Sequence, residues 1–359
     1  MSNPSRSPGR RIGRAVAIAV TAVALVGALG LAVRPSLFSG MAAMTGLTST
    51  KPDGEESAAT TDAQAGTPLH GKRFFGVSVP QGADGNAQVA QFTAAVGVAP
   101  TLQSFFQSFN DQFNSTALKQ TADAGRLPLI AWEPWDHRNP TANPFPLQAI
   151  AAGQFDAYLR AQAASFAAFK TPLVIRFAHE MNGGWYPWGQ RVNGNTGADY
   201  IAAYRHVHDV VTAAGASNVV WMWTPNFLNG RAAQIPLSTL YPGDDVVDWV
   251  GVDGYFMFQH ETFANLFTTT MAQLHSVAPD KPILLAETAV GRTPNRIAQI
   301  NDLVHAVSTT PRVIGFVWSE FPGQRASWPV GDDPAAAAAL GEGVRSGPFG
   351  ATPEAAIRK

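Results

Sequence analysis

The sequence predicts an α/β protein whose main body is a (β/α)8 TIM barrel, and three observations carry this prediction. Eight short runs are almost continuously apolar, as expected for parallel strands covered on both faces. Amphipathic helical stretches lie between them, and the alternation fills about 280 residues, the usual size of such a barrel. The predicted strands are Phe74–Val79, Thr101–Phe106, Leu127–Trp132, Leu173–Ala178, Val219–Thr224, Trp249–Tyr255, Ile283–Ala286 and Val313–Trp318.

Two of the intervening stretches show clear helical periodicity. One is Phe155–Phe169, where the apolar stripe is interrupted only by Gln162. The other is Asn295–Val307, whose predicted buried stripe consists of Ile297, Ile300, Val304 and Val307. A doubly wound open sheet is the alternative fold, but no glycine-rich phosphate loop follows the first strand.

The amino-terminal region has a different composition from the barrel. Residues 1–40 form a basic segment and a signal anchor or signal peptide, because four arginines precede the uncharged run Ala15–Val33. That run nearly matches a bilayer span and no small-residue cleavage site follows at once, which favours an uncleaved anchor. Residues 41–71 are predicted to be a disordered linker. Residues 72–345 are predicted to form the barrel domain, and 346–359 a tail that we expect to fray.

Composition restricts the possible functions. Hydrophobic residues make up 46% of the chain and charged residues 14%, so a large core can form. The net charge of −1 offers no basic field for nucleic acid. The absence of cysteine excludes disulfides and thiolate chemistry. Nine tryptophans are numerous, and tryptophan can stack on sugar rings as well as fill a core.

Polar and aromatic residues stand where the predicted strands end. Active sites of this fold lie at the carboxyl ends of the strands, so these residues are expected to meet at one mouth. Glu180 and Glu287 follow the fourth and seventh strands, and buried carboxylates there have little packing use. The other residues at these ends are Trp132, Glu133, Asn226, Tyr255, Trp318 and Glu320.

The segment His179-Glu180-Met181-Asn182-Gly183, followed by Trp185, Tyr186, Pro187 and Trp188, resembles glycoside hydrolase family 26, as does Glu287-Thr288 on strand seven. The resemblance covers roughly residues 74–328 and places the chain among the β-mannanase-like, retaining clan A glycosidases. It implies that Glu180 is the general acid/base and Glu287 the nucleophile. A retaining mechanism requires their carboxyl groups to lie about 5–5.5 Å apart.

The resemblance also implies substrate-binding residues. His179 would bind the sugar before the scissile bond, Tyr255 would hydrogen-bond the nucleophile, and Trp185 and Trp318 would form aromatic walls. Further candidates are the platforms Trp132, Trp135 and Trp188, and Arg176 as a residue that orients the nucleophile. Each has a structural alternative, namely a buried ion pair for the carboxylates and Arg176, a satisfied core histidine for His179, and core filling for the rings.

Glu133 and Glu320 are assigned no catalytic role; they are expected to bind sugar hydroxyls or to pair with Arg325, while Trp221, Trp223 and Trp249 are assigned to packing. Several chemistries lack their motifs. A zinc protease would need a second histidine at position 183, which is glycine, and neither a Gly-x-Ser-x-Gly elbow nor a phosphate loop is present. The proposed reaction needs no metal and no cofactor.

The predicted function is therefore a retaining endo-β-glycanase that acts on a polysaccharide, with β-1,4-mannan first because it is the commonest activity in the family. Mixed-linkage β-glucan and β-1,3-xylan are the alternative substrates, and transglycosylation would use the same two residues. A non-catalytic glycan-binding barrel is the alternative from another class. The expected protein is a monomer without a nucleic-acid partner, secreted or held at the outer face of the membrane by its amino-terminal segment.

Overall fold

The protein is described by a computed structural model, which covers residues 71–230, 232–322 and 328–357. The predicted anchor (1–40), the linker up to residue 70, and Arg325 lie outside the described residues. Within the described ranges, no helix is both long and apolar enough to cross a bilayer.

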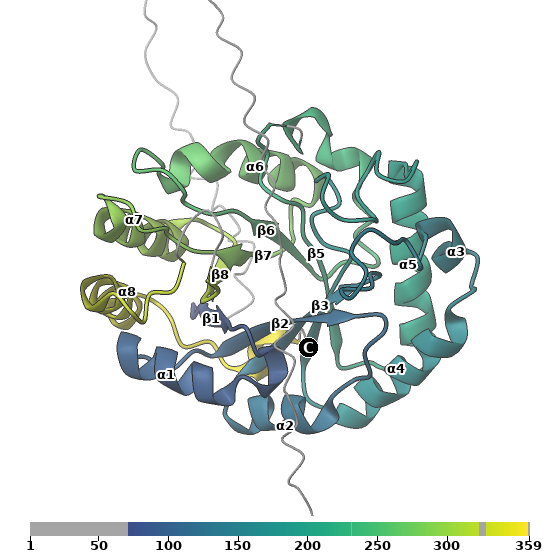
Figure 1. Ribbon diagram of the computed structural model, residues 1–359, viewed down its shortest axis with the longest axis horizontal. Coiled ribbons are helices and arrows are strands. Elements are labelled where there is room, and N and C mark those ends of the chain that lie inside the picture. Colours follow the sequence, from purple (N-terminus) through teal and green to yellow (C-terminus); the bar gives the residue numbers. More distant parts are fainter. Residues whose placement is uncertain (1–70, 231, 323–327, 358–359) are drawn as a thin grey trace, which may run out of the picture.

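The chain forms a closed barrel of eight parallel strands, in which each strand pairs with the next and β8 pairs with β1 (Figure 1). The strands are β1 (Phe74–Ser78), β2 (Leu102–Ser108), β3 (Leu127–Glu133), β4 (Leu173–Phe177), β5 (Val219–Trp223), β6 (Trp249–Asp253), β7 (Ile283–Thr288) and β8 (Val313–Ser319). The predicted fold is therefore confirmed, and every predicted strand is present with small shifts at its ends.

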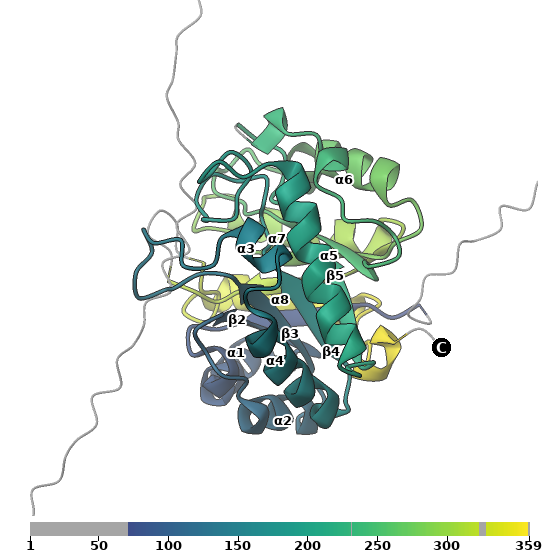
Figure 2. The same ribbon diagram turned by 90° about the vertical axis from the view of Figure 1, so that its right-hand side faces the viewer.

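Helices surround the strands as an outer ring (Figure 1). They are α1 (Asn86–Val96), α2 (Ser115–Asp123), α3 (Leu147–Ala151), α4 (Asp156–Phe169), α5 (Gly197–Ala213), α6 (Phe263–Val277), α7 (Arg296–Thr309) and α8 (Pro334–Ser346). Figure 2 shows α5 on one side of this ring, where it packs against α3 and α4.

One connection departs from the expected alternation of strand and helix. Between β5 and β6 the described residues form two short 3-10 turns, Ala232–Gln234 and Leu237–Thr239. Prolines at 225, 236 and 242 lie in this connection, and each removes a backbone donor that a continuous helix would need. The prediction of a full helix in every crossover was therefore wrong here.

The apolar strands are covered on both faces, as their composition predicted. Alternate residues such as Leu129, Val174 and Met222 fill the barrel interior. Their neighbours, such as Ile130 and Ile175, join a larger cluster between strands and helices. Two layers of core therefore hold each strand in register.

The predicted stripes on α4 and α7 are correct in part. Gln162, which interrupts the α4 stripe, is itself buried. On α7 the prediction that Ile297 is buried was wrong, because this residue is 46% exposed. Arg296 and Gln299 are buried instead, each bonding to backbone carbonyls of neighbouring loops. Hydrogen-bonded polar residues thus extend the buried face at the start of the helix.

An irregularity in β7 decides where Glu287 points. Leu284 and Ala286 face the barrel interior, so strict alternation would turn the next residue toward the helices. The register with β6 and β8 shifts at this point, pairing Asp253 with Glu287 and then Thr288 with Trp318. Such a bulge re-aims a side chain, and here Glu287 faces the interior with Asp253.

The carboxyl-terminal segment closes the opposite end of the barrel. Backbone bonds join Arg73 to Pro348, Gly350 and Ala351. Phe349, Ala351 and Ala356 are buried, the latter two in the inner cluster. The expectation that the tail frays was therefore wrong for residues 346–357, because the barrel needs an apolar cover at its base.

Candidate active site

The candidate site lies at the carboxyl ends of the strands and begins with a distorted segment after β4. Ala178 and Glu180 have left-handed backbone conformations, with φ of 47° and 53°. Non-glycine residues adopt this conformation at a cost, and such strain concentrates at functional sites. Backbone bonds from Ala178 to Trp132 and from Glu180 to Thr224 hold the segment in place. The distortion turns Glu180 into the barrel mouth.

Glu287 is held from two sides. Arg176 donates a hydrogen bond from Nη2 to Glu287 Oε1, and the Tyr255 hydroxyl donates to Oε2 at 2.8 Å. Tyr255 is also 3.0 Å from Ser319 Oγ. Both carboxylate oxygens of Glu287 therefore accept a hydrogen bond, one of them from a charged donor. The structure thus brings three of the predicted site residues together.

Arg176 is the cation at the centre of this group. It is fully buried and also bonds Asp253, with 2.6 Å between Nη1 and Oδ2. Burial alone would lower the pKa of Arg176, but the charges of Asp253 and Glu287 raise it. The guanidinium therefore stays charged and compensates two buried carboxylates at once.

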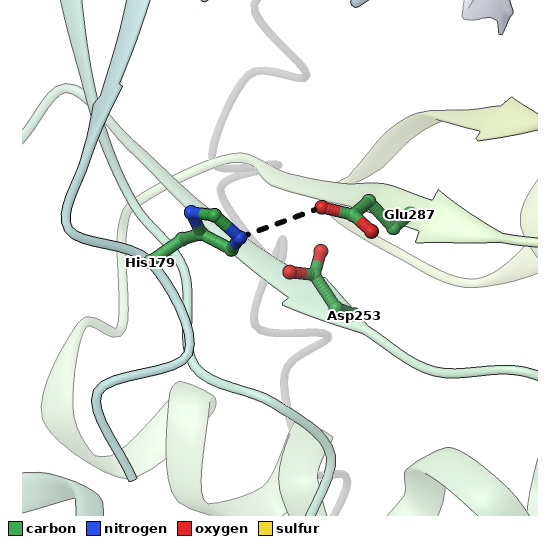
Figure 3. A group of neighbouring side chains, drawn as sticks. All are labelled: His179, Asp253 and Glu287. Atoms are coloured by element: carbon green, nitrogen blue, oxygen red, sulfur yellow. Dashed lines mark ion pairs between the residues drawn. The ribbon is translucent and has the colours of Figure 1, made fainter. Parts of the chain in front are cut away.

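Asp253 is a site residue that the sequence analysis missed. It ends β6 two residues before Tyr255, so its strand-end position was the available signal. Figure 3 shows His179, Asp253 and Glu287 turned toward one another. Their ligand atoms lie within 4.8 Å, a spacing that a metal could use. Arg176 already bonds both carboxylates, so it supplies the positive charge there.

Glu180 is in a contrasting environment. Asn226 Nδ2 donates to its Oε1 at 2.8 Å and Trp185 Nε1 donates to its Oε2 at 2.5 Å. Burial first, and then the negative charge of Glu287, raise the pKa of Glu180 to about 7 against these two hydrogen bonds. Glu180 is therefore suited to hold a proton near neutral pH, whereas Glu287 accepts hydrogen bonds from the charged Arg176 and from Tyr255.

His179 lies next to the same carboxylate. Its Nε2 is 3.7 Å from Glu287 Oε1 and 3.2 Å from the Tyr186 hydroxyl. Burial and the charge of Arg176 lower the pKa of His179 well below its usual value. The imidazole is therefore neutral and acts as a hydrogen-bonding group rather than a second cation.

The predicted aromatic platforms have different positions. Trp185 is half-buried and touches Glu180, so it forms part of the site. Trp188 is buried: it stacks on Tyr186 with 4.3 Å between ring centroids and donates to the His179 carbonyl. Trp135 packs edge-on against this stacked pair and is half-buried. Trp188 thus supports His179 from behind.

The structure does not bring Trp132 and Trp318 to the site. Both are fully buried and belong to the cluster between strands and helices. Trp132 packs against Phe166 of α4 and donates to Tyr158. The reason is strand alternation, which turns these two positions toward the helices while Glu133 and Ser319 beside them face inward. In this position they present no face to a sugar.

Trp328 is the aromatic residue that the strand-based analysis overlooked. Its ring centroid is 4.8 Å from that of Tyr255, at an interplanar angle of 34°. It lies in the loop after β8 rather than at a strand end, which is why the strand pattern gave no signal. It is half-buried and so leaves part of a ring at the site.

Glu133 also reaches the site region. It is buried, bonds His137 at 2.5 Å and lies 4.0 Å from His179. Burial raises the pKa of Glu133 against the lowering effect of His137. The structure therefore gives Glu133 a histidine partner of its own.

A (β/α)8 barrel with two glutamates in contrasting environments at its mouth is an arrangement found in glycoside hydrolases. The profile of glycosyl hydrolase family 26 matches residues 152–306, which include both Glu180 and Glu287. The part of the barrel that carries both glutamates is therefore similar to this family.

Relatives named for different activities are similar to this chain. Endoglucanase H of Acetivibrio thermocellus is 32% identical over 234 residues, which are 62% of this chain and 25% of that protein. The β-1,3-xylanase TXYA of a Vibrio species is 30% identical over 46% of this chain and 32% of its own length. A mannan endo-1,4-β-mannosidase of Bacillus subtilis is 30% identical over 24% of each chain. The chain thus spans only a quarter to a third of these relatives.

Solved structures share the fold. The catalytic domain of the Bacillus sp. JAMB-750 GH26 endo-β-1,4-mannanase superimposes with a TM-score of 0.60 at 20% identity. The match covers 76% of this chain and 86% of that one. At this identity the likeness supports the barrel architecture alone.

Proposed function

We propose that the protein is a retaining endo-β-glycanase that hydrolyses a β-linked polysaccharide by double displacement. The observation that carries this proposal is the contrast between the two glutamates. Glu287 is bonded by Arg176 and Tyr255 in a way that favours its charge, whereas burial and the Glu287 charge raise the pKa of Glu180 to about 7. One group is prepared to attack and the other to give up a proton.

In the first step Glu287 attacks the anomeric carbon and forms a covalent glycosyl ester, while the bond to the leaving oxygen breaks. Protonated Glu180 transfers its proton to that oxygen. In the second step Glu180, now ionised, takes a proton from water, and the water oxygen displaces Glu287. Each step inverts the anomeric carbon, so the product retains its configuration.

Trp185 and Asn226 have a defined part in this cycle. They donate to both oxygens of Glu180, so they stabilise the carboxylate that forms after the first proton transfer. Arg176 and Tyr255 stabilise Glu287 whenever it leaves as a carboxylate. Neutral His179 beside Glu287 is placed to bind a hydroxyl of the sugar undergoing substitution.

We propose β-1,4-mannan as the substrate, supported by the mannosidase relative. Mixed-linkage β-glucan is the second candidate, favoured by the endoglucanase relative, and β-1,3-xylan is the third. A panel of mannan, glucomannan, lichenan and β-1,3-xylan, assayed for reducing ends with Glu287→Gln as the blank, tests these. Binding of a glycan without release of reducing ends would instead indicate a non-catalytic barrel.

We also propose that residues 1–40 direct the barrel to the outside of the cell, as an uncleaved anchor, with the barrel acting as a monomer. Arginines before the apolar run Ala15–Val33 support a cytoplasmic amino terminus. Membrane fractionation and amino-terminal sequencing of the full chain test this. A soluble product starting after residue 33 would show cleavage instead.

A further inference from the structure

The loop that carries Trp328 is bonded by a glutamate at the end of the barrel. Glu320 follows β8 and accepts hydrogen bonds from two successive backbone amides across the loop. Val330 N is 2.9 Å from Oε2, and Gly331 N is 2.9 Å from Oε1. Trp318 Nε1 donates to Oε2 at 3.0 Å and so orients the carboxylate.

A buried arginine holds the same loop at its carbonyl groups. Arg296, the first residue of α7, is 3% exposed. Its Nη2 donates to the carbonyls of Trp328 at 3.1 Å and Pro329 at 2.9 Å. Its Nη1 bonds Asp333, whose other carboxylate oxygen caps α8. The Arg296 guanidinium thus binds the carbonyl groups of residues 328 and 329. The Glu320 carboxylate binds the amides of residues 330 and 331.

The loop held by Glu320 and Arg296 places Trp328 against Tyr255, which bonds Glu287. Trp328 packs on Tyr255 with 4.8 Å between ring centroids, and Tyr255 donates to Glu287. Trp328 is the first residue of the held segment, so its backbone is fixed directly by Arg296. A shift of the loop would therefore move the ring that supports the hydrogen-bond donor of Glu287.

The contact between Glu320 and the loop is close at Gly331. A Cβ atom added at Gly331 would lie 3.2 Å from Glu320 Oε1, a closer approach than most such contacts. Glycine at 331 therefore lets the carboxylate reach both amides. Charge-assisted hydrogen bonds of this kind are stronger than neutral ones and fix direction as well as distance.

We propose that Glu320 and Arg296 are positioning residues that hold residues 328–331 so that Trp328 stays packed against Tyr255. Neither residue contacts the glutamates of the proposed reaction; they act through the loop. The inference rests on the proposed glycanase function, to which it adds two residues outside the site. We call this pair the loop clamp.

The first test compares Glu320→Ala, Glu320→Gln and Arg296→Lys. Small displacements of site groups can lower rates by up to about 100-fold, so Glu320→Ala is expected to reduce kcat/KM by about 10- to 100-fold. Glu320→Gln keeps one oxygen acceptor and should recover part of that loss. Arg292→Ala is the matched control, because it breaks an exposed ion pair with Asp332 beside the same loop. It should leave kcat/KM unchanged.

A double-mutant cycle with Trp328→Ala separates positioning from general stability. If the clamp acts through Trp328, adding Glu320→Ala to Trp328→Ala should lower kcat/KM by less than about twofold more. Equal losses in both backgrounds would overturn the proposal. Should Glu320→Ala not fold, Gly331→Ala replaces it in the cycle, since it keeps both charges and disturbs only the close contact.

Hydrogen exchange gives a readout that does not depend on turnover. The Val330 and Gly331 amides should exchange slowly in the unsubstituted protein and in Glu320→Gln, and faster in Glu320→Ala. Unchanged protection in Glu320→Ala would contradict the clamp itself. If the unmodified protein hydrolyses no glycan of the panel, the proposed function fails, while the exchange rates still decide whether the clamp exists.

Discussion

At the scale of residues, the site depends on the single guanidinium of Arg176, which two buried carboxylates share. Arg176 bonds Asp253 and Glu287 and leaves Glu180 without a cationic partner. Burying several carboxylates with one arginine disfavours a fully ionised group, and burial raises the pKa of both Asp253 and Glu180. Asp253 is bonded by Arg176, whereas the hydrogen-bond donors to Glu180 are the neutral Asn226 and Trp185.

Replacing Glu180 by alanine should expose its role as the acid. General acid–base groups contribute about 10²–10⁴-fold, so polysaccharide turnover should fall by that factor. Aryl glycosides, whose leaving groups need no proton, should lose much less in the first chemical step, and azide should restore their turnover. Glu342→Gln, at a 71% exposed side chain, is the control. Equal losses for both kinds of substrate would contradict the assignment.

The pH dependence of kcat/KM should report the raised pKa of Glu180. The carboxyl is mostly protonated below about pH 7 and loses its proton as pH rises through that value. The proton needed by the leaving group then disappears, so kcat/KM should fall tenfold per pH unit on the alkaline side. A rate profile on mannan or lichenan measures this. An alkaline limb that persists unchanged in Glu180→Gln would assign it to another group.

At the scale of elements, close contacts set by glycine join the helices of the ring. Gly341 of α8 lies against α1, where an added Cβ would be 1.9 Å from the Val96 carbonyl oxygen. The helix can approach this closely only without a side chain. The contact fixes α8, and with it the end of the β8–α8 loop that contains residues 328–331.

Gly341→Ala should therefore destabilise the protein, although alanine favours helix. Helix propensity alone predicts a gain of about 0.5–1 kcal/mol in the free energy of unfolding. Overpacking typically costs about 1–3 kcal/mol, and here the clash is with backbone, so the net change should be a loss. Urea unfolding gives the sign, and increased stability would show that α8 can move away from α1.

At the scale of the whole molecule, the barrel depends on its base as well as its mouth. Phe349 packs edge-on against Phe316 of β8, with 5.6 Å between ring centroids. The segment also pairs with Arg73 just before β1, so it joins the first and last strands. Stability of the closed barrel is therefore linked to residues beyond the last helix.

Phe349→Ala should lower the free energy of unfolding by about 3 kcal/mol, the usual cost of removing a buried phenylalanine ring. Ile357→Ala is the matched control, because its side chain is 39% exposed and the change should stay within about 0.5 kcal/mol. Thermal unfolding of both variants measures the difference. Similar small losses would mean that the tail is peripheral.

The sequence by itself determined the fold and pointed to Glu180 and Glu287 as the candidate reacting pair. Runs of buried strand residues recur eight times, and a carboxylate directly after such a run is costly to bury, which made Glu180 and Glu287 candidates together with Glu133 and Glu320. These are local properties, since the period of apolar residues and the cost of burying charge can be evaluated along the chain.

Only the tertiary structure decided which neighbours complete the site. The bulge in β7 turns Glu287 inward, and plain alternation turns Trp132 and Trp318 away. Asp253, Trp328 and the loop clamp take their roles from contacts between segments distant in the sequence. The physical reason is that side-chain direction depends on register and packing, which no single stretch of sequence specifies.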